Sequence, residues 1–128
     1  MATIRKEILI AAPVERAWAA LRDVGALHTR LVPGFVKDTR MEGNTRVVTF
    51  GNGMVAREEI VSVEEEQHRV CWAIVGQSFH HYNGAAQVFE DINGVRFVWT
   101  TDLLPDAAAD QVEQMMSAGL AVIKETLE

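Results

Sequence analysis

Hydrophobic and polar residues alternate at the beginning of the chain. Ile4, Ile8 and Ile10 share one parity within residues 3–10, which is typical of a β-strand with one buried face. The sequence therefore predicts a first strand that ends before Pro13.

Helical spacing follows the proline. Apolar side chains recur at positions 14, 17, 18 and 21, and this spacing predicts a short helix with one apolar face. Pro13 fits the start of this helix because its missing N–H would have no intrahelical partner there. Gly25 ends the helix, and residues 26–31 could form a further short turn before Pro33 and Gly34 break the chain again.

The middle of the chain, from about residue 35 to residue 103, reads as consecutive strands. Turn sequences occur at Glu42-Gly43-Asn44, at Gly51-Asn52-Gly53, in the acidic run from Glu64 to His68, and at Asn93-Gly94. Asn and Gly favour such turns because they accept positive φ. No helical segment separates these strands, so neighbours in sequence should pair antiparallel as a meander.

The end of the chain carries the clearest periodic pattern. Within residues 105–127, apolar side chains recur every three or four positions, at Ala108, Val112, Met115, Met116, Gly119, Leu120, Ile123 and Leu127. A helix of this length reaches about 34 Å, which matches a strand of about ten residues. The predicted fold class is therefore α+β: a curved antiparallel sheet of about seven strands covered by a long C-terminal helix, with one or two short helices after the first strand.

Composition and charge narrow the function classes. The 128 residues are 48% hydrophobic and 23% charged, so we expect one globular domain over residues 1–128. The net charge is −6 and the basic residues are scattered, which argues against nucleic acid or an anionic membrane surface as partners. No apolar run approaches the roughly 18 residues of a membrane span. A single cysteine, Cys71, fits a reducing compartment, and we expect a cytoplasmic protein.

Three stretches carry a resemblance to a known family. They are EILIAAPVERAW at residues 7–18, GVRFVW at residues 94–99 and DLLPD at residues 102–106. With the order of elements, they resemble the START-like SRPBCC superfamily, and most closely its bacterial polyketide cyclase/dehydrase and lipid-transport branch. The resemblance covers essentially the whole chain and implies a helix-grip fold with a ligand cavity between sheet and helix. Because the superfamily contains carriers, sensors and enzymes, the fold does not choose among them.

Strand parity indicates which side chains face such a cavity. In the last strand, Phe97 and Trp99 lie on the more apolar face. A two-residue turn at Asn93-Gly94 would pair Ala86 with Thr101 and turn the even-numbered residues of the preceding strand inward. A three-residue bulged loop would turn the odd-numbered residues inward instead. We prefer the first register because it leaves the more polar set in water.

Small and flexible residues favour empty space between sheet and helix. Gly84 and Ala86 on the strand face Gly119 on the helix, beside the flexible Met115 and Met116. The alternative is that the small residues allow the helix to pack closely on the sheet.

Two connections could close a cavity mouth. They are residues 25–34, which include Leu27 and His28, and residues 76–79. The alternative is that both are plain connections. The predicted ligand-binding residues are Leu27, His28, Tyr82, Phe97, Trp99, Met115, Met116, Gly119 and Leu120.

Catalytic chemistry has only weak candidates in the sequence. The histidines lack the spacing of a metal site, since His80 and His81 point to opposite faces of a strand, and no glycine-rich phosphate loop is present. We therefore expect no metal and no cofactor. A carboxylate in an apolar pocket could act as acid or base, and the candidates are Tyr82, His80, Glu59 and Arg57. The alternative is that Arg57 and Glu59 form a cross-strand ion pair.

Three functions remain open from the sequence. The first is binding of a small hydrophobic or amphipathic molecule, such as a polyketide, a lipid or an aromatic metabolite. The second is a cyclase or dehydratase reaction in the same cavity. The third is a protein-interaction module or homodimer, because residues 70–75 are apolar on both strand faces.

Overall fold

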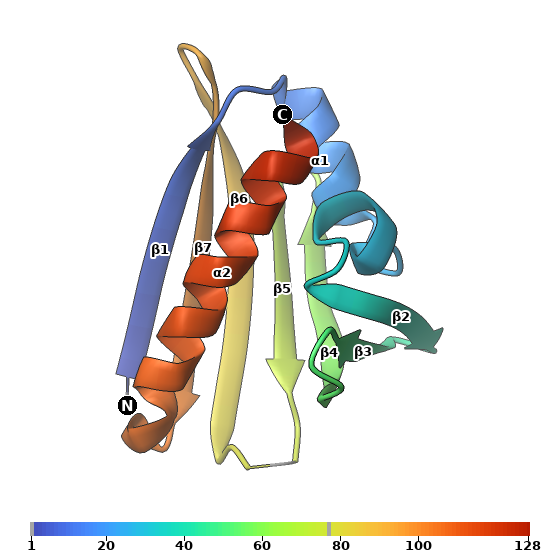
Figure 1. The fold of residues 1–128 in the computed structure, drawn as a ribbon, viewed down its shortest axis with the longest axis vertical. Helices are drawn as coiled ribbons and strands as arrows, with labels where there is room; N and C mark the ends of the chain where they lie inside the picture. Colours follow the sequence, from blue (N-terminus) through green and yellow to red (C-terminus); the bar gives the residue numbers. More distant parts are fainter. Residues whose placement is uncertain (1, 77) are drawn as a thin grey trace.

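A curved antiparallel sheet forms the body of the protein (Figure 1). The structure is a computed structural model that describes residues 2–76 and 78–128, and within these residues the sheet has seven strands in the order β1-β7-β6-β5-β4-β3-β2. The strands are β1 (Ala2–Ile10), β2 (Val36–Glu42), β3 (Thr45–Phe50), β4 (Val55–Glu64), β5 (Arg69–Ile74), β6 (His81–Asp91) and β7 (Gly94–Leu104). Every neighbouring pair is antiparallel. The predicted meander is confirmed, and β1 extends it by pairing with β7.

The helices cover one face of this sheet. They are α1 (Val14–Arg22), the short π-helix η1 (Leu27–Leu31), the 3-10 turn η2 (Asp106–Ala108) and α2 (Ala109–Leu127). Figure 1 shows α2 crossing the sheet diagonally, with α1 and η1 beside its C-terminal end. The predicted helix-grip fold is confirmed, and none of the described helices is long and apolar enough to cross a membrane.

The β6–β7 hairpin differs from the predicted register. Its closing pair is Asp91 with Gly94, so Ala86 pairs with Trp99 rather than with Thr101. The glycine closes the turn at φ 146° instead of lying in its centre. This error of two residues preserves parity, so the even-numbered residues still face inward. The bulged-loop alternative is wrong, because His81 is exposed at the start of β6.

Two hydrophobic clusters form the core on the inner face. The larger one joins α1, η1 and the C-terminal half of α2 to the sheet and includes Phe97 and Ile123. The smaller one gathers Ile4, Leu103 and Met116 near the other end of α2. The helix therefore packs at both ends, and Trp99 contacts both clusters.

Two glycines on the inner surfaces receive tryptophan rings. A Cβ on Gly84 would lie 2.5 Å from Cε2 of Trp72, and a Cβ on Gly119 would lie 2.9 Å from Cζ3 of Trp99. The space left by these small residues is therefore filled by indoles. At these two positions the alternative is therefore right: the small residues allow close packing. At Gly84, however, the ring that fills the space belongs to the sheet and not to the helix.

We expect Gly84→Ala to destabilise the protein. The new methyl group would displace the Trp72 ring, and such overpacking costs about 1–3 kcal/mol. Urea denaturation measures the change. Gly25→Ala is the matched control, since its Cβ would meet only the Met41 side chain, at 3.2 Å. Equal stability of the wild type and Gly84→Ala would contradict the contact.

Candidate functional site

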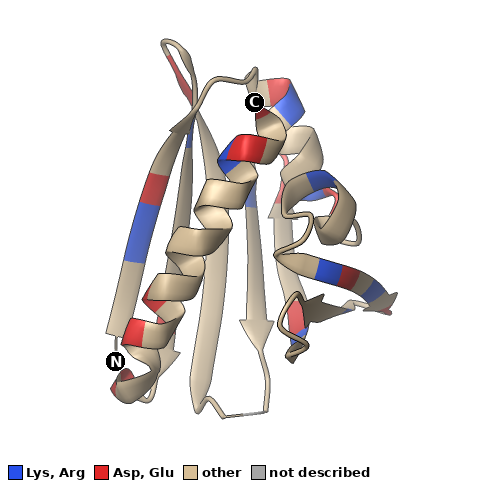
Figure 2. Ribbon diagram, in the orientation of Figure 1, with Lys and Arg blue, Asp and Glu red and all other residues tan. Residues whose placement is uncertain are grey.

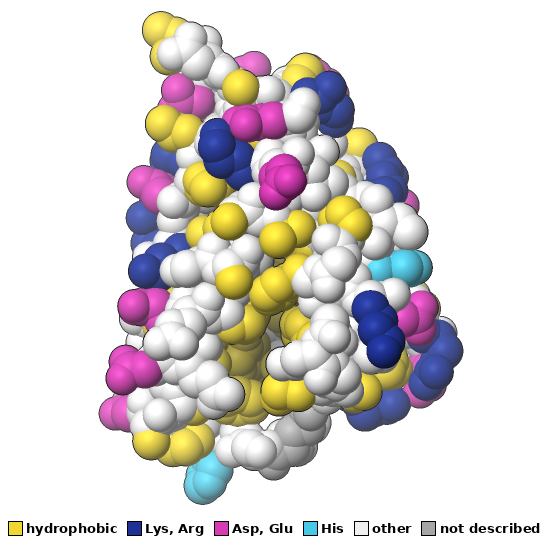
Figure 3. All heavy atoms as spheres, viewed as in Figure 1, with side chains coloured by type: hydrophobic (Ala, Val, Ile, Leu, Met, Phe, Trp, Pro, Cys, Tyr) yellow, Lys and Arg dark blue, Asp and Glu magenta, His cyan; other side chains and the backbone are white. Residues whose placement is uncertain are grey.

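A large cavity lies between the inner face of the sheet and the N-terminal half of α2. Its volume is about 970 Å³, at the upper end of the roughly 300–1,000 Å³ of small-molecule sites. Figure 3 shows its opening as a hollow beside α2 with hydrophobic side chains on its walls. The rim includes the exposed residues Asn52, Met54, Gln111 and Gln114.

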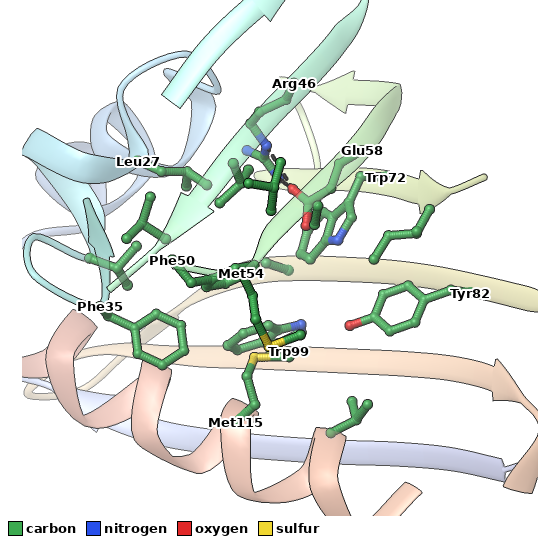
Figure 4. A pocket seen from close by; sticks show the side chains of 18 of the residues that line it. Leu27, Phe35, Arg46, Phe50, Met54, Glu58, Trp72, Tyr82, Trp99 and Met115 are labelled. Carbon is green, nitrogen blue, oxygen red and sulfur yellow. Dashed lines mark hydrogen bonds and ion pairs between the residues drawn. The ribbon is translucent and has the colours of Figure 1, made fainter. Parts of the chain in front are cut away.

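Side chains from the inner face of the sheet form one wall of the cavity. The inward residues of β3 to β7 reach it from one side, while η1 and α2 close the other. The close-up in Figure 4 shows these side chains converging on a common space. Its labelled members are Leu27, Phe35, Arg46, Phe50, Met54, Glu58, Trp72, Tyr82, Trp99 and Met115.

The structure brings together five of the nine predicted ligand-binding residues. Leu27, Tyr82, Phe97, Trp99 and Met115 all line the cavity. Their contact with a ligand stays a prediction.

The other four predicted residues are not among those that line the cavity. Met116 and Leu120 are buried in the two core clusters, and Gly119 lies under the Trp99 ring. His28 is half-buried on η1, and its Nδ1 is buried with no hydrogen-bond partner. The helical period therefore identified the inner stripe of α2 but not which part of it faces the cavity.

The connections predicted as possible gates do reach the cavity. Leu31 and Gly34 line it from the first connection, and Ser78 and Phe79 from the second. Gln77, in the second connection, lies outside the described residues. Sequence reasoning missed the β3–β4 turn, which contributes residues 51, 52, 54 and 55 to the lining.

The predicted acid–base set is not assembled at the cavity. Arg57 and Glu59 face away from it, and Arg57 pairs with Glu42 at 3.0 Å rather than with Glu59. His80 is exposed and does not line the cavity, so Tyr82 alone of the four candidates does. Among the described residues, no three His, Cys, Asp or Glu side chains are grouped to hold a metal ion.

A buried ion pair that the sequence reasoning missed lies in the cavity wall. Arg46 on β3 and Glu58 on β4 are directly paired across the strands. Nε of Arg46 donates to Oε1 of Glu58 at 2.9 Å, and a second guanidinium nitrogen lies 2.8 Å from the same oxygen. The two side chains are only 4% and 10% exposed. Two signals in the sequence could have identified this pair. The turn at residues 51–53 indicates that the two strands pair, and the apolar Ala56 and Ile60 share the parity of Glu58.

Further contacts hold the Arg46 guanidinium in place. Its third nitrogen donates to the backbone carbonyl of Val24 at 3.3 Å, and Cζ lies 5.5 Å from the centre of the Trp72 ring. Among the described residues, no hydrogen bond to Oε2 of Glu58 is found, and Figure 4 shows this oxygen turned away from Arg46. Each guanidinium nitrogen of Arg46 therefore has an acceptor, while Oε2 of Glu58 has no donor among the described residues.

Tyr82 and Trp99 add polar atoms to the same cavity wall. Burial raises the pKa of Tyr82 to about 12, with a smaller lowering by the Thr101 side chain and a smaller raising by the negative charge of Glu58. Figure 4 shows its hydroxyl pointing into the cavity, on the side of Trp99 Nε1. That indole nitrogen is buried and has no hydrogen-bond partner in the described part of the chain. By contrast, Nε1 of Trp18 donates to Glu65 at 2.7 Å.

Comparisons with known proteins agree with this geometry. The family model for polyketide cyclase/dehydrase and lipid transport matches residues 1–128. An uncharacterized protein from Bacillus thuringiensis has a similar structure, with a TM-score of 0.88, 16% identity and 98% of each chain covered. Norcoclaurine synthase from Thalictrum flavum gives a TM-score of 0.72 at 17% identity, covering 98% of this chain and 93% of that one. At such identities the likeness shows the fold alone. No curated protein matches the chain at a significant level.

We expect the Arg46–Glu58 pair to be strongly coupled. Glu58→Leu would leave the Arg46 charge buried and unpaired, which costs about 3–5 kcal/mol of unfolding free energy. The double variant Arg46→Met/Glu58→Leu should lose clearly less than the sum of the two single variants, because it leaves no uncompensated charge. Urea denaturation of the four proteins measures the coupling.

An exposed ion pair serves as the control for this cycle. Arg30 and Asp23 lie 3.0 Å apart at the surface, so Arg30→Met should change stability by no more than about 1 kcal/mol. Additive losses in the Arg46 and Glu58 variants would show that the two charges do not stabilise each other.

We expect Tyr82 to titrate near pH 12 in the folded protein. It is the sole tyrosine of the chain, so phenolate absorbance reports it directly. At about pH 11 the folded protein should show little phenolate, while the urea-unfolded chain, with an ordinary pKa near 10, should show mostly phenolate. A folded-state midpoint near 10 would contradict the burial of this hydroxyl.

The same pKa shift makes stability depend on pH. Above about pH 10 the unfolded chain loses the tyrosine proton while the folded protein keeps it, so stability falls as pH rises towards about 12. The loss reaches at most about 2–3 kcal/mol. Tyr82→Phe should remove this part of the pH dependence, and urea denaturation at several alkaline pH values measures it.

Proposed function

Because the chain belongs to the polyketide cyclase/dehydrase and lipid-transport family, we propose that it binds a small hydrophobic or amphipathic molecule in the cavity between the sheet and α2. The observation that carries this proposal is the cavity itself, a space of about 970 Å³ with mostly apolar walls. A filled core would leave no such volume, because protein interiors are packed to the density of organic crystals. A polyketide, a lipid or an aromatic metabolite has the size and polarity that the walls favour.

The aromatic side chains give the cavity its recognition surface. Trp72, Trp99 and Tyr82 come from three neighbouring strands, while Phe35 and Phe50 lie nearer the mouth. Aromatic rings offer large contact areas with little loss of side-chain entropy. The centroids of the Trp72 and Trp99 rings lie 6.3 Å apart, so the two indoles form one continuous wall.

The fold is known to accommodate small organic molecules in at least one other protein. The Thalictrum flavum norcoclaurine synthase structure contains a transition-state analogue. That protein is an enzyme, whereas the carboxylate in the described wall here, Glu58, is paired with Arg46, which favours binding. Three of the four acid–base candidates lie outside the cavity wall, and Tyr82 is a weak acid near neutral pH because its pKa is raised to about 12.

We expect a cavity-filling variant to weaken the binding of a neutral dye. Nile red should gain fluorescence with the wild-type protein and bind Ala56→Phe at least about tenfold more weakly. Ala56 is a buried wall residue, and a phenyl ring there would occupy the ligand space. A fluorescence titration measures both affinities.

Val61→Phe is the matched control. Val61 lies on the same strand, is 61% exposed and is not part of the wall, so this variant should bind the dye like the wild type. Native mass spectrometry of the purified protein, followed by identification of any compound released on denaturation, gives a second and independent reading. No dye binding by the wild type, together with a mass equal to that of the bare chain, would refute the proposal.

A further inference from the structure

The two charged residues on the described cavity wall neutralise each other. Among the described lining residues, Arg46 and Glu58 are the only charged ones. Figure 2 shows acidic and basic residues on α1, η1, β1 and β2, among other elements, and towards the two ends of α2, while the middle of α2 carries none. The wall therefore has no net charge to offer a ligand.

The charge of the Arg46 cation is already neutralised by Glu58. Its guanidinium is bound to Glu58, to the Val24 carbonyl and to the face of Trp72. A carboxylate or phosphate brought into the cavity would find no free cation and would meet the open oxygen of Glu58. Burial of such a charge without a partner costs several kcal/mol, so an anionic group should stay out of this end of the cavity.

Other polar atoms on the cavity wall favour an uncharged ligand group instead of an anion. Trp99 offers a buried N–H that no described residue accepts, and leaving a buried donor unsatisfied is unfavourable. Glu58 offers an acceptor oxygen to which no described residue donates. A hydroxyl group satisfies both, because it accepts one hydrogen bond and donates another. A carbonyl oxygen satisfies only the donor.

We propose that the cavity selects an uncharged ligand whose buried end carries a hydroxyl group, held between the indole N–H of Trp99, the free oxygen of Glu58 and the hydroxyl of Tyr82. This inference rests on the proposed binding function and adds the chemical class of the ligand to it. According to this inference, the cavity prefers phenols and alcohols to fatty acids and other carboxylates, although an apolar cavity of this size would have room for both.

Three probes of one shape test the proposal. Naphthalene, 2-naphthol and 2-naphthoate share a ring system and differ in one substituent, and isothermal titration calorimetry at pH 7 measures each affinity. We expect 2-naphthol to bind about three- to tenfold more tightly than naphthalene, the gain of a net hydrogen bond. We expect 2-naphthoate to bind no more tightly than naphthalene.

Two variants assign the preference to its residues. Trp99→Phe should bring the affinity for 2-naphthol to within about twofold of that for naphthalene, since it removes the N–H donor and retains an aromatic ring. Glu58→Gln should improve 2-naphthoate relative to naphthalene several-fold, because the Arg46 charge is then no longer neutralised. Circular dichroism checks that each variant is folded, and Trp99→Phe alone suffices if Glu58→Gln does not fold.

Trp18→Phe is the matched control, because Trp18 is not part of the wall and its indole N–H already has a partner in Glu65. It should keep the wild-type preference, and a loss as large as that of Trp99→Phe would overturn the inference. Equal binding of naphthalene and 2-naphthol, or tightest binding of 2-naphthoate, would overturn it while leaving the binding function intact. Failure of all three probes to bind would instead count against the proposed function, and the inference would fail with it.

Discussion

The structure depends on one geometric constraint: one long helix, assisted by the short α1 and η1, has to cover a sheet that is too wide for it. A helix is about 10 Å across, while the described sheet has seven strands spaced at about 4.8 Å. The sheet responds by curving, so that its inner face wraps around α2 instead of lying flat beneath it (Figure 1). Close packing is reached at the two ends of the helix, through the two core clusters. The cavity is the volume that this constraint leaves between the N-terminal half of α2 and strands β3 to β7.

The Arg46–Glu58 pair shows what this volume does to the chemistry around it. The two residues sit opposite each other on adjacent strands, where a surface hairpin would expose them. Here the curvature turns both inward, and neither charge can be tolerated there without the other. Their mutual neutralisation gives the cavity a polar wall without a net charge. The wall at this site is thus polar but carries no net charge. This combination follows from the strand register that pairs the two residues rather than from any single residue type.

Much of the fold follows from sequence patterns, while the site follows only in part. Period-two and helical patterns identified the strands, the long C-terminal helix and the inward parity of β6 and β7, since these depend on neighbours in sequence. The β6–β7 register was wrong by two residues, because a closing glycine and a central one look alike in the sequence. The site was harder to predict, since distance across a curved sheet leaves no local pattern. Glu58 was passed over for Arg57 and Glu59 because Val55 and Val61 make the other parity of this strand partly apolar too, which offset the signal from Ala56 and Ile60.

The distribution of polar atoms along the cavity also gives a ligand a direction. The exposed rim carries the neutral amides of Asn52, Gln111 and Gln114, which compete poorly with water for a ligand's hydrogen bonds because water reaches them freely. Nε1 of Trp99 and the side chain of Glu58 are buried, so a hydrogen bond formed with them is less weakened by such competition. An amphipathic molecule with one polar end therefore gains more by placing that end inward than by leaving it at the mouth. Orientation is decided by the difference in hydration between the two ends of the cavity.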